Sequence, residues 1–207
     1  MIDQIKLIIG QYMRKKTLIM NPKKKKIRII AGKYKGALLS VDHDAVKPTP
    51  DRIRETVFNW LTPFLAESRV IELYGGTGSL SVESISRGSK SSTFIDSSKK
   101  VCEVFKDAII RYRINGIEVI CADANKLIKN ECEKEPYDLI FLDPPYQTLD
   151  FNQILSDLYQ HSWANQSSLI YLESNTNLKT LINSKYELIK DSKAGNVYYG
   201  LLRLRRL

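Results

Sequence analysis

One segment of the sequence is the most informative about its fold: Val70-Ile71-Glu72-Leu73-Tyr74-Gly75-Gly76-Thr77-Gly78. It starts as a short apolar strand, ends in a glycine-rich loop, and is followed by a predicted helix over 80–87. Glycine lets the backbone turn sharply and lets a ligand approach closely. No Gly-Lys-Ser/Thr follows, so the loop is not a Walker motif, and its spacing does not match Gly-x-Gly-x-x-Gly. The strand–loop–helix order predicts an α/β protein with a ligand at this loop.

Strands and helices continue to alternate after this loop. Ala194-Gly195-Asn196 is a turn signal between the last two strands, which should therefore be antiparallel. We expect a mostly parallel, doubly wound sheet with an antiparallel C-terminal edge strand. The predicted strands are 92–96, 118–122, 138–142, 168–173, 186–190 and 197–204, with helices over 98–113, 152–161 and 178–183 between them.

Acidic residues occupy the ends of the first three strands of this region. Glu72 lies in the first strand, Asp96 ends the second, and Asp123 follows the third. Ligands of open α/β sheets bind beyond the carboxyl ends of the strands. There, Asp96 can accept both hydroxyls of a ribose, Asp123 can meet an adenine amino group, and Glu72 suits a cationic amino-acid end. With the loop glycines, the pattern is typical of a class I (Rossmann-like) methyltransferase fold that binds S-adenosylmethionine.

Two other interpretations of these residues remain open. A dinucleotide site would need a helix N-terminus for its pyrophosphate, which Glu72 would repel. Asp96 or Asp123, taken alone, could simply cap a helix. The predicted cofactor-binding residues are Glu72, Tyr74, Gly75, Gly76, Gly78, Asp96, Asp123 and Asp143.

A second motif, Asp143-Pro144-Pro145-Tyr146, follows the apolar run 139–142. An ionised carboxylate only accepts hydrogen bonds, and proline fixes φ and can hold a carbonyl outward. Tyr146 offers an aromatic face for a flat ring. Two acceptors above such a face can hold the amino group of a nucleobase and leave its nitrogen open to attack. We predict that these four residues are catalytic, the alternative being a proline-rich turn.

The net charge of +9 is concentrated in the first sixty residues, which hold fourteen Lys/Arg and five Asp/Glu. A basic N-terminal lobe on a neutral body favours a polyanionic partner, although a solvated lysine tail is the alternative. Strands over 27–30 and 37–41 would form a hairpin with Lys33-Tyr34-Lys35 at its tip, and a helix opens at Pro48-Thr49-Pro50-Asp51. We expect a basic flexible lead over 1–26, an RNA-binding hairpin and helix over 27–61, and a methyltransferase domain over 62–207.

The remaining composition argues against several classes of protein. Cys102, Cys121 and Cys132 match no zinc pattern, and His43 and His161 lie far apart, so no metal site is expected. No apolar run approaches the ~20 residues that span a bilayer. An odd cysteine count without a secretory signal favours a reducing, cytoplasmic location. Met20 could be the start of translation.

The motifs together resemble one family, the RsmD-type 16S ribosomal RNA guanine-N2 methyltransferases of bacteria. The resemblance runs from about Arg28 to Arg205. Departures are Glu72 and Gly75, where the family usually has Asp and Ala, and Ser98, where a second acid is expected. The segments that carry it are Arg28-Ile29-Ile30-Ala31-Gly32-Lys33-Tyr34-Lys35-Gly36, the stretch 47–61 (KPTPDRIRETVFNWL), Glu72 to Gly78, and Asp143 to Tyr146.

The resemblance implies an S-adenosylmethionine-dependent enzyme that methylates the N2 amino group of a guanine. Its partner would be 16S rRNA or the 30S particle, and a monomer is expected. The basic lobe would hold RNA phosphates and stack bases. Its predicted RNA-binding residues are Arg28, Lys33, Tyr34, Lys35, Arg52 and Arg54.

Three rival functions stay open. A DNA adenine or cytosine amino-methyltransferase shares the chemistry of Asp143-Pro144-Pro145-Tyr146, and only the N-terminal segments favour rRNA. Methyl transfer to a glutamine amide is chemically similar but would not need the basic lobe. A non-catalytic RNA-binding assembly factor could keep the fold without turnover.

Overall fold

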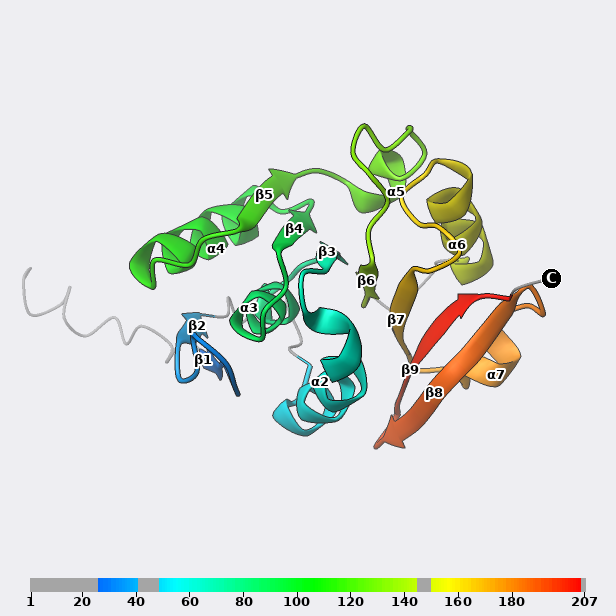
Figure 1. Cartoon of the computed structure of the whole chain (residues 1–207), viewed down its shortest axis with the longest axis horizontal. Helices are drawn as coiled ribbons and strands as arrows, with labels where there is room; N and C mark the ends of the chain where they lie inside the picture. The colour runs from blue at the N-terminus through cyan, green and yellow to red at the C-terminus, as the bar shows by residue number, and fades with distance from the viewer. Residues whose placement is uncertain (1–25, 41–48, 145–149, 206–207) are drawn as a thin grey trace, which may run out of the picture.

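The computed structural model describes residues 26–40, 49–144 and 150–205. The strands are β1 (Lys26–Arg28), β2 (Leu38–Ser40), β3 (Arg69–Leu73), β4 (Ser91–Asp96), β5 (Ile117–Cys121), β6 (Leu139–Leu142), β7 (Leu169–Ser174), β8 (Tyr186–Ala194) and β9 (Val197–Leu204). The helices are α2 (Asp51–Leu65), α3 (Ser79–Ser86), α4 (Lys99–Arg111), α5 (Ala124–Leu127), α6 (Phe151–Gln160) and α7 (Leu178–Leu181). Figure 1 shows these elements arranged around one central sheet, with the β1–β2 hairpin to one side.

The central sheet has the order β5-β4-β3-β6-β7-β9-β8 among the described residues. β3 pairs in parallel with β4 and β6, and the parallel pairing continues to β5 on one side and β7 on the other. β9 is antiparallel to both β7 and β8. The predicted α/β class I fold, with antiparallel pairing among its C-terminal strands, is confirmed. The antiparallel strand β9 lies inside the sheet, because β8 folds back along its outer side.

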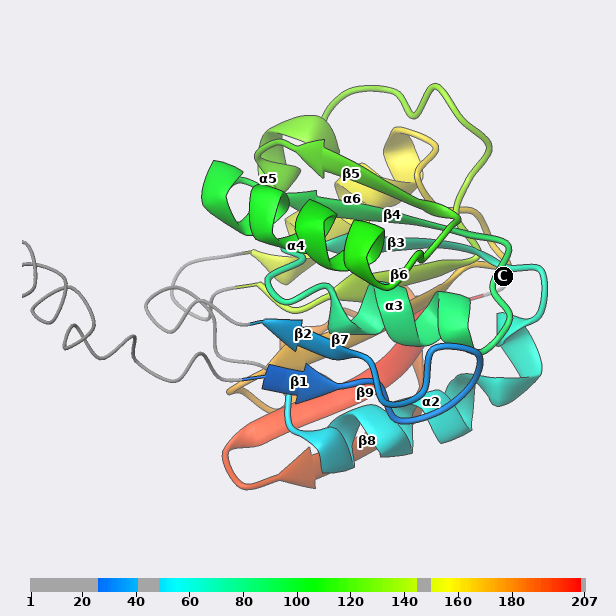
Figure 2. The same ribbon diagram turned by 90° about the vertical axis from the view of Figure 1, so that its left-hand side faces the viewer.

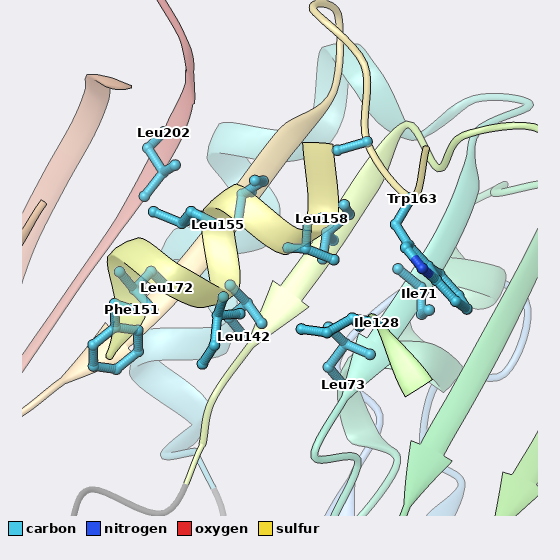
Figure 3. Close-up of a cluster of buried hydrophobic side chains, with 14 of the residues drawn as sticks. Ile71, Leu73, Ile128, Leu142, Phe151, Leu155, Leu158, Trp163, Leu172 and Leu202 are labelled. Carbon is cyan, nitrogen blue, oxygen red and sulfur yellow. The ribbon is translucent and has the colours of Figure 1, made fainter. Parts of the chain in front are cut away.

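Side chains alternate between the two faces of the sheet, and each face has its own core. Val70 and Phe141 pack with apolar residues of α2, including Phe58, on one face. Their chain neighbours Ile71 and Leu142 point to the opposite face, where residues of α5 and α6 cover them (Figure 3). This alternation follows from the two-residue period of a strand. It also decides which polar residues at the strand ends share a side.

The β1–β2 hairpin packs against α3 and α4 through Ile29 and Leu39. The fully buried carboxylate of Glu83 accepts hydrogen bonds from the backbone N–H of Ile30 at 2.8 Å and of Ala31 at 3.0 Å. Gly32 has a φ of 80°, and a Cβ there would lie 1.8 Å from the carbonyl oxygen of Ser86. Because these bonds tie the hairpin to α3, it is a fixed part of the body.

Candidate functional site at the carboxyl edge of the sheet

A cavity of about 700 Å³ lies beyond the carboxyl ends of the parallel strands. This volume falls within the range of small-molecule sites. The parallel strands end on one side of the molecule, and the β8–β9 turn lies on that side as well (Figure 2). The predicted site residues that line the cavity are Glu72, Tyr74, Gly75, Gly76, Asp96, Asp123, Asp143 and Pro144.

Two groups of residues form the cavity wall. We call the first the glycine-loop half, made of Glu72, the loop 74–77, Asp96 and Asp123. The second is the Asp143 half, made of Thr49, Asp143, Pro144 and Glu173. Asn125 also lines the cavity, beside the glycine-loop half.

The glycine loop is shaped by close contacts that exclude side chains. A Cβ on Gly75 would lie 2.2 Å from the ring of Phe94, and a Cβ on Gly78 would lie 2.0 Å from the ring of Phe105. Gly78 also has a φ of 69° and stands at the N-cap of α3, outside the cavity lining. In this chain Phe94 occupies the space that the family's usual alanine would need at position 75. The glycines therefore fix the path of the loop.

Asp96 holds the loop as well as lining the cavity. Its Oδ2 accepts a hydrogen bond from the Gly76 N–H at 2.9 Å, and its Oδ1 accepts one from the Ser98 N–H at 2.8 Å. Ser98, where the family pattern has a second acid, caps α4 by accepting from the Val101 N–H. Each carboxylate oxygen has two lone pairs, so Asp96 can accept from a ribose and hold the loop together.

Asp123 is the N-cap of α5 and accepts from the N–H groups of Asn125 and Lys126. The helix-cap interpretation is therefore correct for this residue, and it lines the cavity too. Tyr74, at a φ of 59°, donates its hydroxyl to Oδ1 of Asn125 at 2.7 Å. Burial, with the negative charge of Asp123, raises the pKa of Tyr74, so this hydroxyl stays protonated. Asn125 was not among the residues predicted from the sequence. Its position two residues after the helix-capping Asp123 was the signal that could have placed it at the site.

Glu72 is 4% exposed and accepts from the Ser81 N–H at 2.9 Å. Desolvation by burial, with a smaller contribution from the negative charge of Asp96, raises the pKa of its carboxyl to about 7, although hydrogen bonds from Ser81 and Leu80 oppose the shift. A buried acid that titrates near neutrality gains a cationic partner readily, because a positive charge restores the ionised form. Glu72 is therefore suited to bind an ammonium group.

The Asp143 half contains two carboxylates that share one hydroxyl. Oγ1 of Thr49 lies 3.0 Å from Oε1 of Glu173 and 3.5 Å from Oδ2 of Asp143, so its single hydrogen goes mainly to Glu173. The hydroxyl of Tyr171 donates to the same Oε1 at 2.6 Å. Burial and the charges of Glu173 and Asp143 raise the pKa of Tyr171 far above its usual value. Tyr171 is therefore a permanent donor to Glu173.

Thr49 and Glu173 were not among the predicted site residues. The register pairs Leu142 with Leu172, so Asp143 and Glu173 follow one residue later on neighbouring strands. Glu173 lies two residues after Tyr171 on β7, so both side chains are on the face of the sheet that packs against α2. The sequence did contain a signal for Glu173, because this acidic residue ends the predicted strand 168–173, which follows the strand before Asp143.

The predicted RNA-binding residues fall into three places. Arg28 and Arg52 are exposed, and Arg52 lies in the first turn of α2, two residues after the cavity-lining Pro50. Lys33 and Lys35 are exposed near the C-terminal ends of α3 and α4, because Lys33 N–H bonds to Ser86 and the half-buried Tyr34 bonds to Arg113. The hairpin tip is thus about 12 Å, the length of an eight-residue helix, from the glycine loop.

The prediction that Arg54 contacts RNA phosphates is wrong, because the side chain is fully buried. Its side chain is 0% exposed and donates to Oδ1 of Asp51 at 2.7 Å and to the carbonyl oxygen of Arg28 at 2.8 Å. Its Nη1 lies 4.0 Å from Oε2 of the buried Glu83. Arg54 joins α2, α3 and β1, and phosphate cannot reach it.

Several predictions concern residues outside the described ranges. Pro145, Tyr146 and the lead 1–25 belong here, so their roles stay predictions. Among the described residues, no group of three or more His, Cys, Asp or Glu is placed to hold a metal ion. No helix in the described ranges is both long and apolar enough to cross a membrane.

Comparison with known proteins agrees with this arrangement. The family model described as Conserved hypothetical protein 95 matches residues 27–203. Ribosomal RNA small subunit methyltransferase D of Buchnera aphidicola subsp. Baizongia pistaciae is 34% identical, covering 84% of this chain and 90% of that protein. The protein of that name from Haemophilus influenzae is 32% identical, covering 86% and 94%.

A solved structure from Escherichia coli, described as a "Putative methyltransferase", superposes with a TM-score of 0.77. It is 26% identical and covers 87% of this chain and 98% of its own. The resemblance predicted from the motifs is thereby confirmed. The chain belongs to the Conserved hypothetical protein 95 family, together with the ribosomal RNA small subunit methyltransferase D proteins.

Proposed function

We propose that this protein transfers a methyl group from S-adenosylmethionine to the N2 amino group of a guanine in 16S rRNA, free or within the 30S particle. The observation that carries the proposal is that one cavity joins the glycine loop to Asp143 and Pro144. A donor site and an acceptor site that share a cavity bring two reactants together, and such positioning is a large part of catalysis.

The glycine-loop half fits S-adenosylmethionine by its chemistry. Glu72 faces the cavity with a carboxyl whose pKa burial raises to about 7, and a cationic ammonium group would restore its charge. Asp96 would accept from the ribose hydroxyls and Asp123 from the adenine amino group. Gly75 and Gly76 both line the cavity, so the loop backbone lies beside the proposed ligand site.

The Asp143 half would hold the amino group that is methylated. Bound S-adenosylmethionine supplies an electrophilic methyl group on sulfur. Asp143 and the carbonyl of Pro144 would accept hydrogen bonds from the two N2 protons, and Tyr146 would stack on the base. Holding both protons shifts the N2 lone pair out of the ring system and aims it at the methyl group. The N2–C bond would form as the S–C bond breaks, which leaves S-adenosylhomocysteine, and Asp143 would help remove the surplus N2 proton.

The substrate class follows from the basic lobe and the family. The relatives are named for the small-subunit ribosomal RNA, and the N-terminal sixty residues carry the whole net charge of +9. A guanine must leave its stack to enter the cavity, which favours an unpaired loop of the RNA. One chain contributes both halves of the cavity, so a monomer in the cytoplasm would suffice.

Tritiated methyl transfer to a panel of acceptors tests this proposal. The panel comprises 30S subunits, naked 16S rRNA, duplex DNA and a ribosome-free protein fraction, each incubated with labelled S-adenosylmethionine. We expect label in the 16S rRNA of at least one of the first two. Label in DNA or protein alone would overturn the substrate, and no label with any acceptor would favour a non-catalytic RNA-binding role.

A further inference from the structure

Glu173 is a buried carboxylate that the proposed reaction does not yet use. It is 2% exposed, and it is one of the residues that line the cavity. Two hydroxyls donate to its Oε1, from Thr49 at 3.0 Å and from Tyr171 at 2.6 Å. Two donors on one oxygen fix the orientation of the carboxyl group and identify it as an acceptor.

Asp143 and Glu173 lie at the same level, at the carboxyl ends of two neighbouring parallel strands. The pairing of Leu142 with Leu172 sets this level, and Thr49 spans the two carboxyl groups. Both line the same cavity. A flat ring held at Asp143 would therefore present its adjoining edge to Glu173.

Two adjacent acceptors match the edge of one nucleobase. Guanine carries the N1–H donor directly beside its N2 amino group. Adenine and cytosine carry an unprotonated ring nitrogen, an acceptor, beside their amino groups. When two acceptors face each other in a buried site, no hydrogen bond forms between them, and the desolvation of both groups is not compensated.

We propose that Glu173 accepts a hydrogen bond from N1–H of the guanine whose N2 amino group Asp143 holds. Glu173 is then the residue that selects guanine over bases with an acceptor next to the amino group. This inference rests on the proposed function, because it places that guanine in the cavity.

Replacing the target guanine by 2-aminopurine tests the inference. 2-Aminopurine keeps the amino group at C2 but has an unprotonated N1. RNA would be ligated to carry either guanine or 2-aminopurine at the position that the wild-type protein methylates. The kcat/KM of methyl transfer is then measured for both RNAs, with the wild type and with Glu173→Gln.

The glutamine keeps an oxygen for Thr49 and Tyr171 and turns an N–H donor toward the base. We expect the wild type to prefer guanine by about 10- to 100-fold, the value of a buried charge-assisted hydrogen bond. Glu173→Gln should lose most of that preference by slowing on guanine and gaining on 2-aminopurine. The missing O6 of 2-aminopurine affects both proteins alike and cancels from the ratio of the two preferences.

Tyr171→Phe is the matched control, since it removes one donor to Glu173 but leaves the carboxylate, and it should keep the preference. An equal loss on both RNAs in Glu173→Gln would overturn the inference and leave Glu173 a structural role. Equal turnover of both RNAs by the wild type would overturn it without any variant. If the wild type methylates no guanine at all, the proposed function itself fails, which is a separate result.

Discussion

The glycine-loop half and the Asp143 half of the cavity hold their carboxylates with different donors. Glu72, Asp96 and Asp123 accept from backbone N–H groups of nearby loops and helix starts. Glu173 accepts from the side-chain hydroxyls of Thr49 and Tyr171. Backbone donors survive most substitutions, whereas a hydroxyl is lost with its side chain. The geometry of the glycine-loop half should therefore depend on the path of the loop, and that of the Asp143 half on individual side chains.

Removing Asp143 should give the largest effect, because it takes the principal acceptor out of the second half alone. Asp143→Ala should lower kcat for RNA methylation at least about 1000-fold, the combined scale of lost positioning and proton removal. Binding of S-adenosylmethionine, measured by calorimetry, should change only a few-fold. Asp107→Ala, on the exposed face of α4, is the control. Near-normal turnover by Asp143→Ala would remove the catalytic assignment.

Glu72 should make ligand binding at the glycine-loop half depend on pH. Its pKa is raised to about 7 before the ligand binds, and a cationic ligand requires the ionised form. Binding of S-adenosylmethionine should therefore tighten as pH rises from 5.5 to about 7, by up to tenfold for each pH unit. Glu72→Gln should bind with a flatter pH profile, and comparison of the two proteins cancels the titration of the ligand. Identical profiles would contradict the role of Glu72.

The raised pKa of Glu72 also predicts how the stability of the ligand-free protein changes with pH. The carboxyl of Glu72 titrates near 4.5 when unfolded and near 7 when folded. Its stabilising contribution is complete below pH 4.5 and is lost as pH rises through 7, by about 3 kcal/mol at most. Urea unfolding at pH 5 and pH 8 should show this loss in the wild type and a smaller one in Glu72→Gln. A wild-type loss no larger than that of the variant would count against the raised pKa.

Gly78 tests how far the loop path depends on glycine. Gly78→Ala adds a Cβ 2.0 Å from the Phe105 ring at a φ of 69°, whereas Gly195→Ala at a φ of 59° meets nothing within 4 Å. We expect urea unfolding to show a loss of about 2–4 kcal/mol for the first and about 1 kcal/mol for the second. Equal losses would mean that the contact with Phe105 relaxes without cost.

Arg52 should give the smallest effect, on RNA binding alone. It is exposed beside the cavity, whereas Lys33 and Lys35 lie at the far end of α3. With a short RNA hairpin, Arg52→Ala should flatten the salt dependence of binding by about one unit of slope, without changing stability. The double variant Lys33→Ala, Lys35→Ala should matter only for longer RNA. The reverse order of effects would move the RNA path to the hairpin tip.

The sequence predicted the glycine-loop half because its signals are local. Three glycines, a strand before them and acids at the next strand ends are enough to place Glu72 and Asp96 at one edge. Thr49 meets Glu173 across 124 residues, and only the strand order brings them together. A contact of that kind depends on the finished topology.

Arg54 shows the opposite error, a residue assigned to the surface from charge alone. Its neighbour on the same helix, Arg52, is exposed, yet Arg54 is fully buried. The difference arises because β1 and Glu83 of α3 cover that side of α2. Charge and helical spacing do not reveal which side of a helix a distant hairpin will cover.

The identity of the methylated nucleoside is the decisive measurement for the proposed function. 30S particles or 16S rRNA that lack the modification would be treated with the protein and S-adenosylmethionine, digested to nucleosides and resolved by mass spectrometry. We predict N2-methylguanosine, formed by the wild type and not by Asp143→Ala. Methyl groups on guanine N1, adenine N6 or cytosine N4 would contradict the arrangement of two acceptors at Asp143 and Glu173.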